Sequence, residues 1–166
     1  SPPPSSRKVL RYEQRQAYVA HTDYFNYKTS ADHNWDPRAG GTNRMATLFL
    51  YLSDVELGGQ TVFPRVARNA SHAALHGGPP SAPPAKAEEL FANASWEAKL
   101  TRDCYRQFAV TPRKGDAILF YSQKAGGELD VMSLHGGETT TGRDAAAIAR
   151  DRARGGWKDS SRALPP

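Results

Sequence analysis

The chain has 166 residues, with 22 lysines and arginines against 17 aspartates and glutamates, which gives a formal net charge of +5. That length predicts one domain with its own core. The modest basic excess comes without a base-stacking or groove-reading motif, so we expect no nucleic-acid partner. No stretch approaches the roughly 20 apolar residues that a membrane-spanning helix needs, so the sequence predicts no membrane segment.

In chain order, a proline-rich segment over residues 1–7 precedes a domain over residues 8–142. Loop insertions at 26–42 and 66–92 interrupt this domain, and a basic tail over 143–166 follows it. The domain reads as short strands separated by turns, which is typical of a mainly β sandwich or barrel. The predicted strands are Lys8–Glu13, Ala17–His21, Met45–Leu52, Gln60–Phe63, Phe108–Thr111, Ala117–Ser122 and Met132–His135.

Two of these strands are nearly continuous apolar runs, and one insertion has its own composition. Met45–Leu52 and the run from 117 to 121 predict central strands that are covered on both faces. The proline-rich run from 77 to 84 favours polyproline II conformation. A short helix is predicted after it over Lys86–Ala92, where alanine, glutamate and leucine are good helix formers.

The most informative pattern consists of two histidines and one aspartate. His21 and Asp23 are separated by one residue at the end of a predicted strand, and His135 lies far downstream. Side chains alternate between the faces of a strand, so positions 21 and 23 point the same way and can bind one ion. Two imidazoles and one carboxylate on one side of a metal are the ligands of many non-heme Fe(II) oxygenases. The alternative is a pair of buried polar residues with an unrelated surface histidine.

Long segments around this pattern resemble one family. They are Val9–Glu13 with Tyr18–Phe25, then Asn43–Pro64, then Pro112–Ser122 with Leu129–Gly137. In this order they resemble the prolyl 4-hydroxylases of the plant and algal type, which are Fe(II)/2-oxoglutarate-dependent dioxygenases. The resemblance covers about residues 9–137.

The resemblance implies a fold and a reaction. The fold is a double-stranded β-helix, or jelly roll, with iron at one mouth. The reactants are Fe(II), 2-oxoglutarate and O2, and ascorbate restores iron that has oxidised. Oxidative decarboxylation of 2-oxoglutarate to succinate is coupled to hydroxylation of proline at C4 in a proline-rich polypeptide. His21, Asp23 and His135 are then both the metal ligands and the catalytic residues.

The same resemblance suggests further site residues, each with an alternative. Tyr12 would help to hold 2-oxoglutarate, or would be an ordinary core tyrosine. Thr47 would face the cosubstrate pocket, or the core. Tyr18 and Arg44 resemble residues that line the peptide groove, although Arg44 is equally read as a solvated strand-edge charge. Trp35 would stack on a substrate proline, as aromatic grooves do with polyproline II peptides.

The resemblance ends after Gly137. The family holds the far carboxylate of 2-oxoglutarate with a basic residue, usually lysine, about ten positions after the distal histidine, and Ala145 stands there. Arg143 is the nearest cation in sequence, and a guanidinium binds carboxylates bidentately. The final jelly-roll strand is not recognisable. Two alternatives therefore stay open: a non-catalytic protein that binds metal and peptide, and a hydroxylase of a different substrate.

The predicted cellular location rests on two short sequence motifs. Asn69-Ala70-Ser71 and Asn93-Ala94-Ser95 are glycosylation sequons. Together with the family likeness, they suggest the endoplasmic reticulum or secretory pathway.

Overall fold

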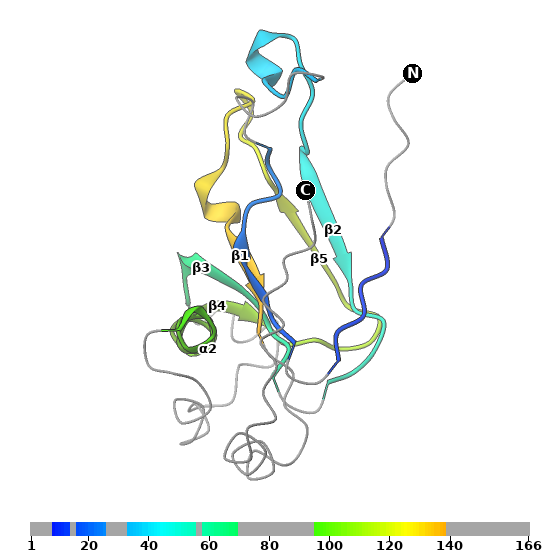
Figure 1. Ribbon diagram of the computed structural model, residues 1–166, viewed down its shortest axis with the longest axis vertical. Helices are drawn as coiled ribbons and strands as arrows, with labels where there is room; N and C mark the ends of the chain where they lie inside the picture. The colour runs from blue at the N-terminus through cyan, green and yellow to red at the C-terminus, as the bar shows by residue number, and fades with distance from the viewer. Residues whose placement is uncertain (1–7, 14–15, 26–32, 56–57, 70–94, 139–166) are drawn as a thin grey trace.

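Two β-sheets and one α-helix make up the part of the chain that the computed structural model describes, which is residues 8–13, 16–25, 33–55, 58–69 and 95–138 (Figure 1). The larger sheet has four strands in the order β1-β6-β3-β4, and the smaller has two, β2 and β5. The mainly β character that the sequence predicts is confirmed for these residues.

All neighbours in the larger sheet are antiparallel. Its strands are β1 (Tyr18–His21), β6 (His135–Gly137), β3 (Thr61–Ala67) and β4 (Gln107–Val110). β6 lies between β1 and β3, with residue 137 opposite both Tyr18 and Thr61. Segments from both ends of the domain thus meet in this sheet.

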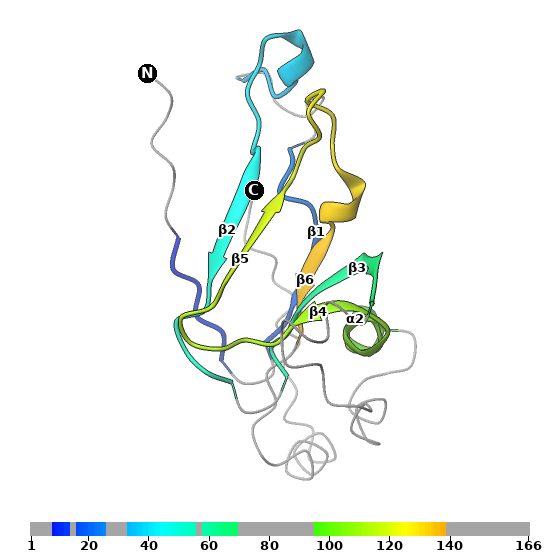
Figure 2. The same cartoon turned by 180° about the vertical axis from the view of Figure 1, so that it is seen from behind.

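The smaller sheet is a regular antiparallel pair. β2 (Ala46–Leu50) and β5 (Ala117–Tyr121) run side by side without a register shift, from the pair Ala46 and Tyr121 to the pair Leu50 and Ala117 (Figure 2). Side chains alternate between the two faces, so Thr47 and Phe120, which are partners in the register, share one face. That face is turned toward the larger sheet, because the Phe120 ring lies 5.3 Å from the ring of Phe63 on β3.

Helix α2 (Trp96–Arg106) covers the other face of the larger sheet. Its start is capped by Ser95, whose side chain accepts a hydrogen bond from the Ala98 N–H. Its inward side chains pack on β3 in a core formed by Val62, Leu100 and Cys104. Burial of each of the two larger aliphatic side chains contributes about 2 kcal/mol to stability. This helix was not among the predicted elements.

Gly136 allows β1, β6 and α2 to approach closely. A Cβ at this position would lie 2.9 Å from Leu100 Cδ1 and 3.0 Å from the Tyr18 carbonyl oxygen. Any larger residue would therefore push the helix or the neighbouring strand away. The glycine after His135 is thus explained by packing.

Three strand predictions need correction. Residues 8–13 are not a strand: they are exposed and pair with no other strand in the described part of the chain. β2 and β5 are not covered on both faces, because Leu48 and Leu119 on their outer face are more than half exposed. The segment Met132–His135 is mostly a 3-10 turn, η2 (Val131–Ser133), which Asp130 caps through the Met132 N–H, and β6 begins only at His135.

The remaining predicted strands are confirmed to within two residues at their starts, but β3 runs on to Ala67, into the predicted insertion at 66–92. A second 3-10 turn, η1 (Pro37–Ala39), lies within the insertion at 26–42. The segment 1–7, the tail 143–166 and the helix predicted over Lys86–Ala92 lie outside the described residues. Over the described residues, no helix has the length and apolar character needed to cross a bilayer.

Candidate metal centre

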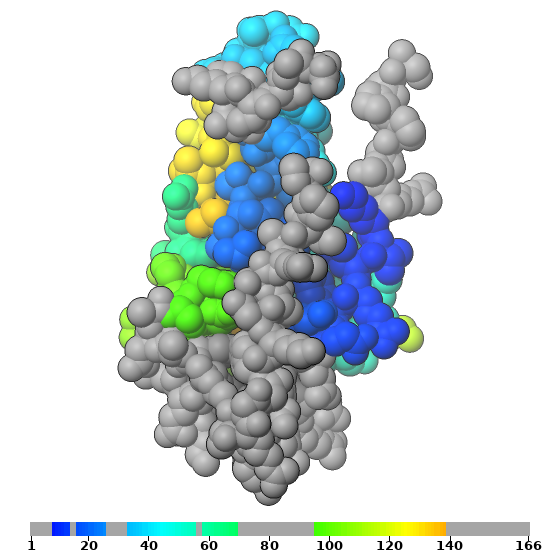
Figure 3. All heavy atoms as spheres, in the orientation of Figure 1, coloured from blue at the N-terminus to red at the C-terminus, as the bar shows by residue number. Residues whose placement is uncertain are grey.

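His21, Asp23 and His135 come together at one end of the space between the sheets. His21 ends β1 and His135 begins β6, and the two residues are opposite each other in the register. One ligand atom from each of the three residues lies within 4.8 Å of the others. In Figure 3, β1 and the segment leading into β6 lie against each other on one face of the molecule. The three residues predicted from the sequence are therefore one cluster.

Backbone hydrogen bonds orient both imidazoles. The His21 Nδ1 lies 3.0 Å from the Val19 carbonyl oxygen, and the His135 Nδ1 lies 2.9 Å from the Ser133 carbonyl oxygen. A carbonyl only accepts hydrogen bonds, so each Nδ1 carries the proton and donates it. Nε2 is then the ring nitrogen left for a metal in each histidine. This is the arrangement in which second-shell groups prepare histidine for metal binding.

The Asp23 carboxylate is held from two sides. The Thr47 hydroxyl on β2 donates a hydrogen bond to Oδ2, and Arg44 Nη1 lies 3.4 Å from Oδ1. The hydrogen bond from His21 and that from Thr47 hold the pKa of Asp23 well below its usual range, against the opposing effect of burial. The carboxyl is therefore ionised at neutral pH. Of the two predicted settings of Thr47, the cosubstrate pocket or the core, neither is tested by this contact, which joins Thr47 to a candidate metal ligand.

The directions of the pKa shifts of Asp23 and His135 suit a divalent cation. Burial lowers the pKa of His135, which favours the neutral imidazole that binds metal. Two imidazoles and one carboxylate in one cluster match the donor set of non-heme Fe(II) centres. The residues fit Fe(II).

A second polar pair lies deeper between the sheets. Tyr51 directly follows β2, and its hydroxyl donates a 2.8 Å hydrogen bond to the Thr61 hydroxyl on β3. Both residues are buried, and burial raises the pKa of Tyr51 to about 12. Tyr51 lies four residues beyond Thr47, and Thr61 two residues before Phe63, whose ring is 6.0 Å from that of His135. Strand alternation therefore places both hydroxyls on the faces that carry the site.

Sequence reasoning missed this pair. Tyr51 directly follows β2 and Thr61 begins β3, and each hydroxyl stands beside apolar residues. A polar group in such a context is the signal that was available.

Tyr12 and Tyr18 flank the cluster on one side. The Tyr18 ring lies 4.4 Å from the His21 ring and 6.4 Å from the Tyr12 ring. Both tyrosines are more than one-third exposed. Tyr12 is thus not an ordinary core residue, and its pKa is raised first by partial burial and then by Tyr18.

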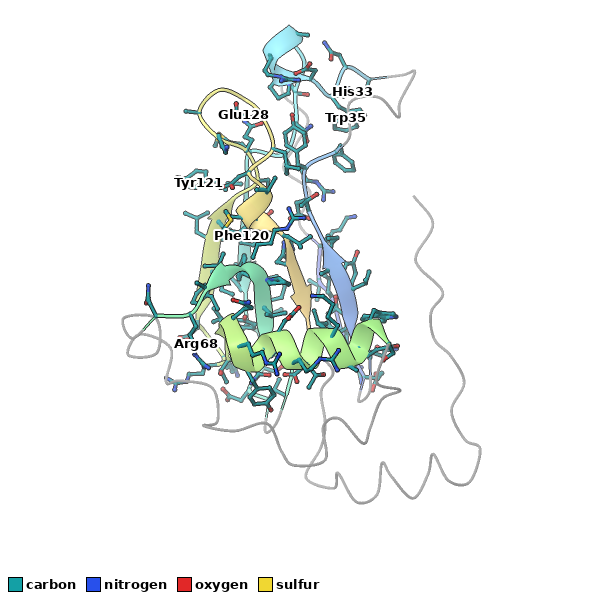
Figure 4. All side chains as sticks on the ribbon, turned by 90° about the vertical axis from the view of Figure 1, so that its left-hand side faces the viewer. His33, Trp35, Arg68, Phe120, Tyr121 and Glu128 are labelled. Atoms are coloured by element: carbon teal, nitrogen blue, oxygen red, sulfur yellow. The ribbon has the colours of Figure 1, made fainter. Side chains whose placement is uncertain are left out.

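Arg44 and Trp35 are joined to the cluster through Asp23 and Phe25. The Arg44 guanidinium lies over the Phe25 ring, 4.6 Å from its centroid, and the Trp35 ring lies 4.4 Å from that of Phe25. His33 follows at 4.1 Å from Trp35, and Figure 4 places both at the end of the molecule opposite α2. Arg44 is therefore in contact with Asp23, and Trp35 is linked to it through Phe25. The remaining predicted site residue, Arg143, lies outside the described residues.

Comparison with known proteins agrees with this geometry. The family model described as the 2OG-Fe(II) oxygenase superfamily matches residues 7–150. The chain is similar to two proteins of Arabidopsis thaliana, probable prolyl 4-hydroxylase 3 (37% identical over 130 residues) and prolyl 4-hydroxylase 2 (37% over 132 residues). Each alignment covers 78% of this chain, but only 36% and 35% of the relative, so the chain spans about a third of their length. On the match over residues 7–150, the chain belongs to the 2OG-Fe(II) oxygenase superfamily.

Proposed function

We propose that the chain hydroxylates peptidyl proline to 4-hydroxyproline, with O2 and 2-oxoglutarate as co-reactants and succinate and CO2 as co-products. The observation that carries the proposal is the cluster of His21, Asp23 and His135, whose donor atoms lie within 4.8 Å of one another. The names of the two Arabidopsis relatives support the choice of proline as the substrate.

The three residues would hold Fe(II), which supplies the O2-activating chemistry when it is bound. Three protein ligands leave coordination positions for the keto acid and O2. The protein's own contribution is orientation. The Val19 and Ser133 carbonyls fix the imidazoles, and Thr47 fixes the carboxylate.

The Tyr51 and Thr61 hydroxyls are proposed to bind the far carboxylate of 2-oxoglutarate. A carboxylate between the sheets needs hydrogen-bond donors, because burial without them is costly. With its pKa raised to about 12, Tyr51 stays protonated and donates to Thr61, which leaves the Thr61 proton free to point at a ligand. Tyr12 and the cation Arg143 remain proposed partners of 2-oxoglutarate, as the sequence suggests.

The peptide is proposed to bind on the surface formed by Tyr18, Arg44 and Trp35. Tyr18 contacts His21, and Arg44 contacts both Asp23 and the Phe25 ring that lies against Trp35, so aromatic rings and a guanidinium adjoin the cluster. Aromatic surfaces bind polyproline II segments, since the peptide is already ordered in that conformation. A proline-rich polypeptide is thus the substrate class that the surface favours.

Three finer proposals come from the family likeness. The two sheets are proposed to belong to a jelly roll, ascorbate to restore oxidised iron, and the protein to work in the secretory pathway. Asn69, the asparagine of one sequon, is exposed two residues after the end of β3, which supports the last of these.

The deciding experiment is mass spectrometry of a proline-rich peptide incubated with the protein, Fe(II), 2-oxoglutarate, ascorbate and air. We expect a gain of one oxygen atom on proline, matched by succinate, and neither product with His135→Ala. Succinate without peptide oxidation would indicate a different substrate. No succinate from folded, iron-loaded protein would indicate a non-catalytic protein that binds metal and peptide.

A further inference from the structure

The Asn43 side chain joins three separate parts of the chain beside the metal cluster. Its Oδ1 accepts hydrogen bonds from the backbone N–H groups of Phe25 (3.0 Å) and Arg44 (2.9 Å). Its Nδ2 donates to the carbonyl oxygens of Phe25 (3.0 Å) and Trp35 (2.8 Å). An asparagine amide offers two acceptor sites and two donor protons, so every one of them is used.

The three parts that Asn43 joins meet again through their side chains. Phe25 stands two residues after the metal-cluster residue Asp23, and its ring lies between the Arg44 guanidinium (4.6 Å) and the Trp35 ring (4.4 Å). Arg44 in turn reaches Asp23 Oδ1 at 3.4 Å. The row Arg44–Phe25–Trp35, which we call the aromatic wall, therefore starts at the metal cluster and runs outward.

We propose that Asn43 is a positioning residue that assembles the aromatic wall, and that the substrate polypeptide binds against this wall. The inference rests on the proposed function for the identity of the peptide. Asn43 itself need not touch the substrate, because all its hydrogen-bonding groups are already used within the protein.

The composition of the wall suits an extended, proline-rich chain. Such a segment lacks N–H donors at its prolines but presents carbonyl oxygens, and the exposed Arg44 guanidinium has N–H groups to donate to them. Aromatic rings offer flat faces for pyrrolidine rings. The wall supplies both kinds of contact only while Arg44, Phe25 and Trp35 keep their relative places, and the Asn43 amide fixes the backbone of all three.

Asn34 provides a matched control. Its side chain makes two hydrogen bonds against the four of Asn43, accepting from the Asp36 N–H and donating to the Ala39 carbonyl, both at 3.0 Å. Both partners lie in the same short turn, so Asn34→Ala removes the same chemical group without separating the parts of the wall.

The first test measures the dissociation constant of a labelled proline-rich peptide from Mn(II)-loaded protein, which requires no turnover. Asn43→Ala should weaken peptide binding about 10-fold, which is the size of effect seen when a group that orients binding residues without touching the ligand is removed. Asn34→Ala should change the dissociation constant less than twofold. In turnover, Asn43→Ala should raise the peptide KM by a similar factor with a smaller change in kcat. Equal effects of the two alanine variants would overturn the inference.

A double-mutant cycle tests whether Asn43 acts through the wall. In an Arg44→Met background, Asn43→Ala should weaken peptide binding less than threefold, because part of what it positions is gone. Additive losses would overturn the inference. Trp35 fluorescence, measured with Trp96 and Trp157 replaced by Phe, should become more accessible to acrylamide in Asn43→Ala. Greater Trp35 accessibility with unchanged peptide binding would show that Asn43 has only a structural role.

The experiments distinguish failure of the proposed hydroxylase function from failure of the positioning role of Asn43. If the wild-type protein forms no hydroxyproline, the proposed function is wrong, while the peptide dissociation constants still decide the role of Asn43. If hydroxylation occurs and Asn43→Ala binds peptide as wild type does, only the positioning role is wrong.

Discussion

His21 and His135 are direct cross-strand partners in the larger sheet, with ring centroids 4.5 Å apart. This pairing depends on an irregularity, because Tyr18 pairs with Gly137 and the register then shifts by one residue before His21. β-bulges of this kind turn a side chain toward a site. Without the shift, residue 134 rather than His135 would stand opposite His21. The bulge in β1 is therefore part of the metal cluster.

The two histidines are two of the three proposed metal ligands. His135→Ala should therefore lower the affinity for Fe(II), or for Co(II) as its surrogate, by about 100-fold or more. This exceeds the effect of losing a residue that only hydrogen-bonds to a ligand. Isothermal titration measures this directly. His72→Ala, in a residue outside the described ranges, is the control and should bind metal as wild type does. Equal affinities for wild type and His135→Ala would show that the cluster is not the metal site.

Thr47→Val should lower metal affinity about 10-fold, since it removes the hydroxyl that donates to Asp23 Oδ2 and keeps the shape of the side chain. Thr47→Ser keeps the hydroxyl and should recover most of the loss in the same titration. If valine and serine bind metal equally well, the hydrogen bond to Asp23 contributes nothing to the site.

Tyr51→Phe should raise the KM for 2-oxoglutarate about 10-fold, because one buried hydroxyl of the proposed cosubstrate site is lost. Succinate formation at varied 2-oxoglutarate gives the number. Tyr121→Phe is a matched control, since Tyr121 lies on the outer face of β5 and is more than half exposed. Similar KM values for the two variants would place the cosubstrate elsewhere.

His21 and Asp23 were predictable as a pair because only one residue separates them at the end of a strand-like segment, although β1 ends at His21 and Asp23 lies in the bend that follows it. Thr47 was harder. Alternation gives the face of a strand, but not the atom that the side chain meets across the gap, and here that atom is Asp23 Oδ2. Asn43 offered no signal at all, because its four partners belong to three segments that only the fold brings together.

The strands were predictable to a similar extent. Apolar runs correctly located β2 and β5, but an apolar run cannot show whether something covers the second face of its strand, and the outer face of this sheet is exposed at Leu48 and Leu119. Helix α2 was missed although Ser95 is a capping residue and Ala98, Thr101 and Cys104 follow at helical spacing.

Gly136→Ala should destabilise the protein by about 2 kcal/mol, in the range typical of overpacked cores. The added Cβ would meet Leu100 Cδ1 at 2.9 Å and the Tyr18 carbonyl oxygen at 3.0 Å. Gly137→Ala is the matched control, because its Cβ would have 3.6 Å to the nearest atom, an ordinary contact. Urea denaturation measures both variants. An equal loss in the two would show that backbone freedom matters here and not the close packing of α2 against β6.

Glu138 makes folding stability depend on pH. Its carboxyl is buried directly after β6, and burial raises its pKa to about 8, with only partial relief from a hydrogen bond to Cys104. Below the ordinary pKa of 4.5 the group is protonated in both the folded and the unfolded protein. As the pH rises, the unfolded chain releases the proton while the folded protein still holds it, so the free energy of unfolding falls until the pH passes about 8.

Each pKa unit corresponds to about 1.4 kcal/mol, so the loss between pH 4.5 and pH 8 is at most about 5 kcal/mol. Glu138→Gln cannot ionise and should remove this part of the pH dependence, which makes the variant more stable than wild type at pH 9 but not at pH 5. Urea denaturation at the two pH values measures the difference, with Glu128→Gln as a control for the change in net charge. Parallel pH profiles for wild type and Glu138→Gln would show that the buried carboxyl is not the group that titrates.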